Sequence, residues 1–368
     1  MTELGVAMIG HGFMGAAHSQ GWRTAPRAFA LDAETRMRVV VGRDADRARE
    51  AAARWGWEES SADWRAVLER DDIHIVDIVT PGDSHAELAI AALRAGKHVL
   101  LEKPLANTAE EADAIAAAAA DAGTVTMTGF VFRRVPAATL FQRLVAEGFV
   151  GEIRQVRASY LQDWLSDADA PWVWRLDKSL AGSGALGDIG AHAVDLSQFV
   201  TGMLVAEVSG TLATLVPERS GRPVTVDDVA LFTARFDSGV LGVFEATRFA
   251  TGHRNSLRVE VSGSRGAIAF DLADMNALQV YDATAPADRR GFTRIDVTEG
   301  VHPYLEGWWP PGHALGYEHG FSHQVRDLVD AIVAGGSAAP DFASGAQVQR
   351  VLDAIERSAG DGSAWTRV

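Results

Sequence analysis

The sequence predicts an α/β protein of two domains, the first built on a doubly wound parallel sheet and the second on a large, open, mainly antiparallel sheet. With 368 residues, the chain is too long for one ordinary core. As far as about residue 129, short apolar runs alternate with helical patterns, which is typical of repeated βαβ units. Beyond that point, strand patterns follow one another with turn residues between them. We therefore expect one domain at 1–129 and a second at 130–368, whose C-terminal helices could pack back on the first.

The first strand, Gly5–Ile9, runs directly into a glycine turn, Gly10-His11-Gly12-Phe13-Met14-Gly15, and a helical pattern follows. Glycines at this spacing before a helix N-terminus can aim backbone N–H groups at a pyrophosphate, as in a Rossmann fold. The turn alone is a weak signal, because glycines occur in many turns. We expect a dinucleotide to bind here, with contacts from Gly10, Gly12, Phe13, Met14 and Gly15.

The other elements of the first domain follow from the same patterns. Apolar runs predict strands at Met37–Val41, Ile73–Val79, His98–Leu101 and Val125–Thr128. Periodicity predicts helices at Asp44–Trp55, Ser84–Ala95 and Ala109–Ala122, the last with Thr108 and Glu111 spaced as a capping box. The stretch Ala25–Thr35 is predicted to be a surface loop.

The second domain is predicted to hold seven main strands and three helices. The strands are Ile153–Tyr160, Val205–Leu215, Val229–Phe236, Gly239–Thr247, Ser256–Ser262, Gly266–Asp271 and Ala277–Tyr281. The clearest hairpin turns are Asp237-Ser238-Gly239 and Gly263-Ser264-Arg265-Gly266. One amphipathic helix is expected at about Gly187–Val200, and two more at His319–Ala334 and Ala343–Ser358.

Composition excludes several function classes. The net charge of -15 disfavours nucleic acid as a partner, and the absence of cysteine rules out disulfides, thiolate nucleophiles and thiolate metal sites. No apolar run is long enough to cross a membrane, and the N-terminus lacks a secretion signal pattern, so we expect a cytoplasmic protein. A small, neutral, polar substrate fits this balance best.

Glu102-Lys103-Pro104 falls at the carboxyl end of a predicted parallel strand. Ligands of open α/β sheets bind outside those strand ends, so Lys103 is expected in the same crevice as the glycine turn. There it could hydrogen-bond a substrate oxygen and help remove its proton. The alternative is a surface lysine fixed by a turn proline.

A second candidate site lies on the helix predicted at Gly187–Val200. Asp188, His192 and Asp195 are spaced i, i+4 and i+7, which places them on one helix face. A carboxylate and an imidazole one turn apart can hold a hydroxyl, and histidine is the natural proton acceptor near neutral pH. The alternative is a satisfied polar stripe. A metal site is not expected, because no further histidine or carboxylate cluster stands at ligand spacing.

These three motifs, in this order, resemble the Gfo/Idh/MocA family of nicotinamide-dependent oxidoreductases, which includes inositol dehydrogenases and glucose-fructose oxidoreductase. The resemblance covers essentially the whole chain and extends to Thr80-Pro81 and His85. It implies that Lys103 is the catalytic lysine, Asp188 the substrate-binding aspartate and His192 the acid/base histidine. It also implies cofactor contacts from Thr80, Pro81, His85, Glu102 and Lys103, an active site between the domains, and a homo-oligomer formed through the free sheet face.

Within the family, several stretches look most like a branch that oxidises C3 of a pyranose or anhydrosugar to a ketone. They are Tyr160–Trp164, Trp174-Arg175, Lys178–Asp188, Pro217–Arg219 and Glu245–Arg248. The resemblance therefore implies a sugar or cyclitol substrate. Expected substrate contacts are Tyr160, Gln162, Asp163, Trp174, Arg175, Asp188, His192, His313 and Tyr317. Aromatic rings can stack on sugar C–H faces, although most tryptophans in any protein pack in the core.

The cofactor choice stays open between NAD and NADP. Many NAD-using members carry an acidic residue after the second strand, whereas this chain has Gly42 followed by Arg43 and Asp44. Arg43 could pair with a 2′-phosphate, or it could stack on adenine while Asp44 or the backbone serves the ribose. The resemblance favours NAD slightly.

Two other functions are compatible with the same family. Some relatives oxidise C3 only transiently and act as NAD-dependent glycosidases, and others bind the cofactor as non-catalytic sensors. The presence of Lys103 and His192 disfavours both, because such proteins tend to lack one of these residues.

Overall fold

The computed structural model describes residues 2–368, which fall into two compact units. The first comprises the chain as far as Val131 together with Gly316–Gln347, and the second comprises Phe132–Leu315 and Val348–Val368. The segment after Leu315 thus returns to the first unit, and the second unit is not one continuous stretch.

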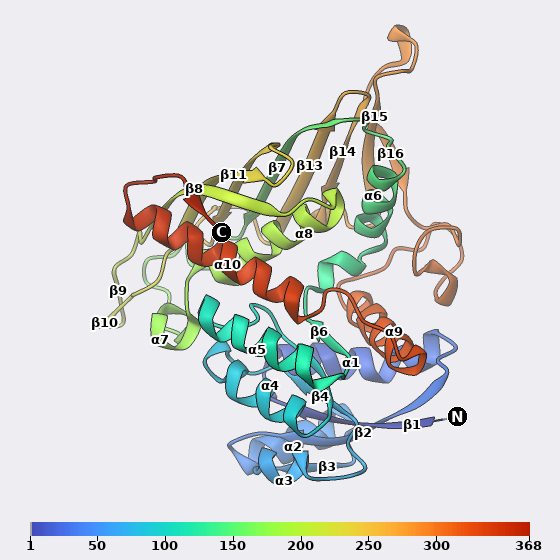
Figure 1. The fold of residues 1–368 in the computed structure, drawn as a ribbon, viewed down its shortest axis with the longest axis vertical. Helices are drawn as coiled ribbons and strands as arrows, with labels where there is room; N and C mark the ends of the chain where they lie inside the picture. The colour runs from blue at the N-terminus through green and yellow to red at the C-terminus, as the bar shows by residue number, and fades with distance from the viewer. Residues whose placement is uncertain (1) are drawn as a thin grey trace. The chain divides into compact units, whose positions relative to one another are not determined.

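The first unit is built on a six-stranded parallel sheet in the order β3-β2-β1-β4-β5-β6, which confirms the predicted doubly wound fold. The strands are β1 Thr2–Ile9, β2 Ala33–Val41, β3 Glu59–Ser61, β4 Ile75–Ile78, β5 His98–Leu101 and β6 Thr126–Thr128. Helices cover the sheet (Figure 1): α1 Phe13–Ala28, α2 Ala45–Trp55, α3 Trp64–Leu68, α4 His85–Arg94, α5 Ala109–Ala122 and α9 His319–Ala334. The sequence reading missed β3 and α3.

Helix α9 packs directly on α1. A Cβ at Gly21 would lie 2.9 Å from the carbonyl carbon and oxygen of Phe321, so glycine permits this close approach. The predicted loop Ala25–Thr35 is wrong, because α1 continues to Ala28 with Pro26 inside it and β2 begins at Ala33.

Helix caps in this unit use side chains. Asp44 Oδ1 accepts the N–H groups of Asp46 and Arg47, each at 3.1 Å. Before α5, Thr108 Oγ1 accepts the N–H of Glu111 at 3.2 Å. The Glu111 carboxylate accepts the N–H of Asn107, also at 3.2 Å. The Thr108 half of the predicted capping box is therefore confirmed, whereas the Glu111 carboxylate binds the N–H of the residue before Thr108.

The second unit is built on a nine-stranded sheet in the order β16-β15-β14-β13-β7-β12-β11-β8-β17. Among the strand pairs described in this sheet, β12–β7 is parallel and the others are antiparallel, so the sheet is mainly antiparallel, as predicted. The strands are β7 Ile153–Leu161, β8 Val205–Ala213, β11 Val229–Phe236, β12 Leu241–Thr247, β13 Ser256–Gly263, β14 Gly266–Asp271, β15 Ala277–Asp282, β16 Thr293–Asp296 and β17 Thr366–Arg367. A separate ribbon pairs β9 Glu218–Arg219 with β10 Arg222–Pro223.

Two helices, α6 Pro136–Ala146 and α8 Ala191–Thr201, pack on one face of this sheet (Figure 1). The other helices here are α7 Lys178–Ala181 and α10 Phe342–Gly360, which starts within the first unit. Helix α6 was missed in the sequence. Side chains alternate between buried and exposed along β11 and β12, so the far face of the sheet is open.

The helix predicted at Gly187–Val200 is confirmed as α8, but its first turn departs from α-helical geometry. Leu186–Gly190 is a π-helical turn, which precedes α8. The buried Asp195 carboxylate forms a bidentate ion pair with Arg133 at 2.5 to 3.0 Å, so Arg133 neutralises this third residue of the predicted set.

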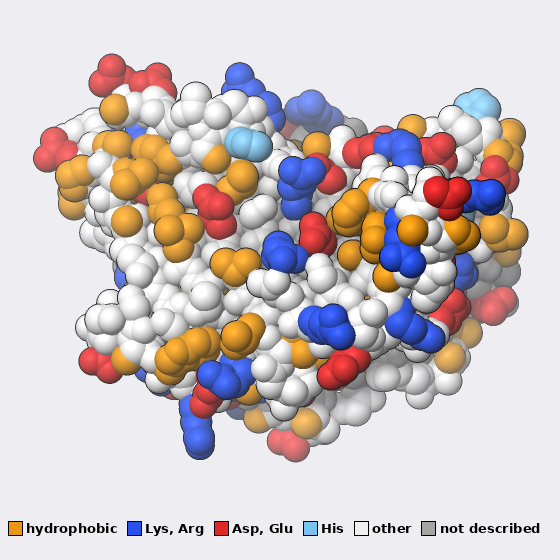
Figure 2. Space-filling model, turned by 90° about the horizontal axis from the view of Figure 1, so that it is seen from above, with side chains coloured by type: hydrophobic (Ala, Val, Ile, Leu, Met, Phe, Trp, Pro, Cys, Tyr) orange, Lys and Arg blue, Asp and Glu red, His pale blue; other side chains and the backbone are white. Residues whose placement is uncertain are grey.

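No helix among residues 2–368 combines the length and apolar character needed to cross a membrane. Figure 2 shows one face on which Lys, Arg, Asp and Glu are interspersed between separate hydrophobic groups. The charge of -15 therefore does not form a field of one sign on this face.

Candidate functional site

The glycine turn connects β1 to α1 at the carboxyl edge of the parallel sheet. Gly10 has a φ of +114°, and its N–H donates to the Val41 carbonyl at 2.9 Å. Gly12 is the N-cap of α1 without a side-chain cap, and a Cβ there would meet no atom within 4 Å. The first N–H groups of α1 therefore lie beside open space, where they can bind a phosphate.

The tip of β2 carries a histidine from the glycine turn instead of an acidic side chain. A Cβ at Gly42 would lie 2.6 Å from His11 Nε2, so the His11 ring fills that space. Arg43 is exposed. The cap hydrogen bonds from Arg47 and Asp46 lower the pKa of Asp44, whose Oδ1 is committed to helix α2.

His85 links two turns at the same sheet edge. Its Nε2 lies 2.9 Å from the Thr80 carbonyl and its Nδ1 lies 3.1 Å from the Pro104 carbonyl. Burial lowers the pKa of His85, which disfavours the charged ring. Among the predicted cofactor residues, His85 thus supports the turn that carries Lys103.

A buried cluster of charged groups lies beneath that turn. His18 Nδ1 donates to both Asp77 carboxylate oxygens at 2.9 and 3.0 Å, and Nε2 donates to Glu102 Oε1 at 3.0 Å. Trp22 Nε1 adds a hydrogen bond to Asp77 at 2.7 Å. Burial alone would lower the pKa of His18, but the Asp77 charge and the hydrogen bonds that the ring donates to both carboxylates raise it to about 10. His18 is therefore an imidazolium at neutral pH.

Glu102 connects the buried cluster to Lys103. Its second carboxylate oxygen, Oε2, accepts the backbone N–H of Lys103 at 3.1 Å. Tyr317 stacks on Phe13 with ring centroids 6.3 Å apart and contacts Phe321 edge-on. Burial and then the Glu102 charge raise the pKa of Tyr317. The first unit thus places Tyr317 beside the glycine turn and close to Glu102.

In the second unit, His192 is buried in an aromatic setting. Its ring centroid lies 4.6 Å from that of Phe132 and 5.9 Å from that of Tyr160. The Tyr160 hydroxyl and Gln162 Nε2 both donate to Asn255 Oδ1, at 2.7 and 2.8 Å. Trp164 Nε1 donates to Gln162 Oε1 at 3.0 Å, which completes a chain of polar groups.

Asp188 lies in the π-helical turn. A buried carboxylate, that of Asp227, fixes the backbone where this turn begins. Asp227 accepts the N–H groups of Gly184 and Leu186 at 2.6 and 2.7 Å. Burial raises the pKa of Asp227, although these two hydrogen bonds oppose the shift. Asp188 itself faces the buried guanidinium of Arg248, with Nη1 and Oδ2 3.7 Å apart.

Other predicted substrate residues are engaged elsewhere in the second unit. Asp163 accepts the Gly252 N–H at 3.1 Å and pairs with Arg254 at 3.3 Å. Arg175 stacks on its neighbour Trp174 at 4.5 Å. His313 is exposed, with Nδ1 2.8 Å from the Pro310 carbonyl.

Sequence reasoning missed Asn255, Phe132 and any role for Arg248 in the site. Asn255 precedes β13 in a turn without a motif, so no sequence signal identified it. Arg248 belongs to a stretch noted only as part of the family resemblance. Among residues 2–368, no group of three His, Asp or Glu side chains could hold a metal ion.

Comparisons with known proteins cover the full chain. The family model "Oxidoreductase family, NAD-binding Rossmann fold" of Gfo/Idh/MocA matches residues 4–130, and "GFO/IDH/MocA C-terminal domain" matches residues 139–269. Levoglucosan dehydrogenase of Pseudarthrobacter phenanthrenivorans is 42% identical over 100% of this chain and 99% of its own. Inositol 2-dehydrogenase of Rhizobium meliloti is 27% identical over 95% of each.

Solved structures of oxidoreductases are also similar to this chain over its whole length. An oxidoreductase domain protein from Kribbella flavida has a TM-score of 0.98 at 60% identity, covering 100% of both chains. A levoglucosan dehydrogenase in complex with NADH and levoglucosan has a TM-score of 0.97 at 43% identity, covering 100% of this chain and 99% of that one.

The His18 cluster predicts a pH dependence of stability. The folded-state pKa of about 10 lies above the ordinary 6.5, so proton binding stabilises the fold fully below pH 6.5. That contribution is lost as the pH rises through 10. We expect the thermal midpoint of His18→Gln to change less between pH 6.5 and 10 than that of the parent protein.

The matched control is His98→Gln, because burial lowers the pKa of His98 and so moves its titration away from the alkaline part of this window. Its midpoint should run parallel to the parent curve. A His18→Gln curve that is also parallel would contradict a charged His18.

Proposed function

Because the chain belongs to the Gfo/Idh/MocA family of oxidoreductases, we propose that it is an NAD-dependent sugar dehydrogenase. It transfers a hydride between nicotinamide and the carbon of a ring hydroxyl in a sugar or cyclitol. The preferred substrate is a pyranose or anhydrosugar such as levoglucosan, oxidised at C3.

One observation carries this proposal: the full-length likeness to levoglucosan dehydrogenase includes the elements that hold the polar chain beside His192. Tyr160, Gln162 and Asn255 form a linked set of hydrogen-bonding groups next to an exposed Trp164. Linked donors and acceptors beside an aromatic ring suit a ring with several hydroxyls. This setting favours a carbohydrate over an apolar alcohol.

The residues divide the chemistry among them. Bound NAD supplies the hydride acceptor. His192 accepts the proton of the reacting hydroxyl, Lys103 stabilises the developing alkoxide, and Asp188 orients that hydroxyl or an adjacent one. The buried setting of His192 keeps this base away from bulk water.

The glycine turn and the open N-terminus of α1 suit the pyrophosphate of NAD. At the adenosine end, His11 and Arg43 replace the usual acidic side chain, so NADP is a second cofactor to assay. The enzyme would work in the cytoplasm, where the nicotinamide coenzymes are available.

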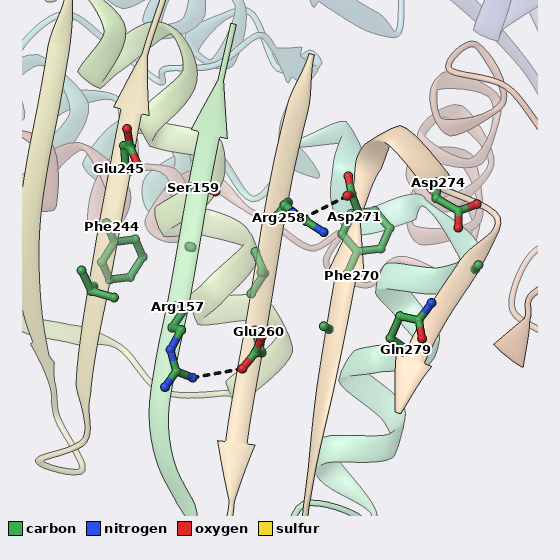
Figure 3. Close-up of a pocket in the computed structure, with 15 residues that line it drawn as sticks. Arg157, Ser159, Phe244, Glu245, Arg258, Glu260, Phe270, Asp271, Asp274 and Gln279 are labelled. Atoms are coloured by element: carbon green, nitrogen blue, oxygen red, sulfur yellow. Dashed lines mark hydrogen bonds and ion pairs between the residues drawn. The ribbon is translucent and has the colours of Figure 1, made fainter. Parts of the chain in front are cut away.

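The open sheet face supports a homo-oligomer with a second copy of the chain as the partner. Leu231, Leu241 and Val243 are each 45 to 49% exposed there. The adjoining groove has a volume of about 560 Å³ and carries the ion pairs Arg157–Glu260 and Arg258–Asp271, each at 3.0 Å (Figure 3). Apolar side chains beside charges of both signs can complement the same face of another copy.

Activity with NAD and NADP should be followed at 340 nm with pyranoses, anhydrosugars, cyclitols and glycosides. We expect stoichiometric NADH from levoglucosan or a related sugar. Lys103→Ala and His192→Asn should each lower kcat by roughly 10²-fold or more, while NADH binding, measured by fluorescence, persists. Release of an aglycone without net NADH would instead identify a glycosidase, and full activity in either variant would contradict the assigned roles.

Val243→Glu should shift the oligomer toward monomers in light scattering after size exclusion, because it places charge in the apolar contact. Ala120→Glu, at an exposed position on helix α5 of the first unit and away from this sheet, tests for a general charge effect. A monomeric parent protein would exclude the proposed assembly.

A further inference from the structure

The second unit contains a fully buried arginine, Arg248, to which the proposed chemistry assigns no role. Arg248 follows β12, and its side chain has no exposed surface. Its backbone N–H donates to the Asp228 carbonyl at 3.2 Å, and its own carbonyl accepts the Leu165 N–H at 3.1 Å. Hydrogen bonds therefore fix the backbone of Arg248 at both its N–H and its carbonyl.

The Arg248 guanidinium makes a hydrogen bond and a contact with an aromatic ring. Nη2 donates to the Asp227 carbonyl at 3.2 Å, and the group lies 5.4 Å from the centre of the Trp164 ring. Nε and Nη1 make no hydrogen bond within residues 2–368. A desolvated cation with unused donors is costly, so a nearby negative charge has a large effect on it.

The nearest carboxylate oxygen is Oδ2 of Asp188, 3.7 Å from Nη1. Asp188 is the proposed substrate-binding residue, and 26% of its side chain is exposed. Arg248 thus approaches this carboxylate from the buried side, while part of the carboxylate remains accessible to a ligand.

We propose that Arg248 is the positioning residue of the substrate site, which keeps the Asp188 carboxylate ionised and oriented toward a sugar hydroxyl. This inference rests on the proposed dehydrogenase function. A neutral Asp188 would lose the acceptor strength that a hydroxyl donor needs, and an unanchored one could rotate away.

Asp227 and His192 are two further ionisable groups near Asp188. Asp227 lies beyond Arg248 and is satisfied by the N–H groups of Gly184 and Leu186. His192 follows four residues later, at the start of α8. Arg248 is a cation that acts on both carboxylates, so its removal should make Asp188 easier to protonate.

The chain offers a matched control in Arg219. It is equally buried, and it lies 5.6 Å from the Phe249 ring. Its guanidinium donates to backbone carbonyls, at 2.7 Å for Leu165 and 2.6 Å for Asp167, and among residues 2–368 it pairs with no carboxylate. Arg219→Met therefore removes a buried arginine without removing a partner of Asp188.

The test compares Arg248→Met, Arg248→Lys and Arg219→Met in kcat and KM for the sugar from pH 5 to 10. We expect Arg248→Met to raise KM about tenfold and to move the acidic limb of kcat/KM upward by roughly one pH unit. NADH binding should be unchanged, and Arg248→Lys should restore most of the profile. Arg219→Met should lower the thermal midpoint without moving the limb.

Thermal midpoints of Arg248→Met, Asp188→Asn and the double variant give a readout that does not need activity. Coupled residues predict that the double variant is less destabilised than the sum of the two single variants. Additive midpoints, or an unmoved acidic limb in an active Arg248→Met, would overturn the proposal. A parent protein without dehydrogenase activity but with coupled midpoints would overturn only the proposed function.

Discussion

The nucleotide-binding unit depends on one buried cation, the His18 imidazolium held between Asp77 and Glu102. Asp77 is on β4, Glu102 follows β5 and His18 is on α1, so the cluster fixes a helix to the carboxyl ends of two central strands. Two carboxylates this deep would repel one another and lose hydration, and the protonated ring offsets both costs. Because Glu102 also accepts the Lys103 N–H, the same charge positions the candidate catalytic turn.

Buried charged side chains also position the candidate site residues in the second unit. Asp227 accepts a backbone hydrogen bond just before the π-helical turn. Arg248 lies beside the Asp188 carboxylate on its buried side, and Arg133 forms an ion pair with Asp195. Asp227 precedes β11, Arg248 follows β12 and Arg133 precedes α6, so the three groups come from different connections. The result is a site whose exposed atoms are few and whose supporting contacts are buried, as orientation of a small polyol demands.

The sequence predicted the parallel strands well because central strands such as β4 and β5 are mostly apolar, with one polar residue each, Asp77 and His98. Strand β3 escaped because Glu59, Ser60 and Ser61 carry no apolar signal, and it pairs only at an edge. The motifs around Lys103, Asp188 and His192 could be found because their spacing is local. Contacts such as Gln162 with Asn255 span 93 residues and depend on strand register, which single-sequence patterns do not encode. The π-helical turn likewise followed from the tertiary bond to Asp227.

The central claim is direct hydride transfer from a ring carbon of a sugar to the nicotinamide. Levoglucosan deuterated at C3 tests it most directly, with NAD as the acceptor and the reduced coenzyme analysed by mass spectrometry and NMR. We expect one deuterium at nicotinamide C4 for each ketone formed, together with a slower hydride-transfer step. Reduced coenzyme without deuterium, or deuterium released to water, would contradict it.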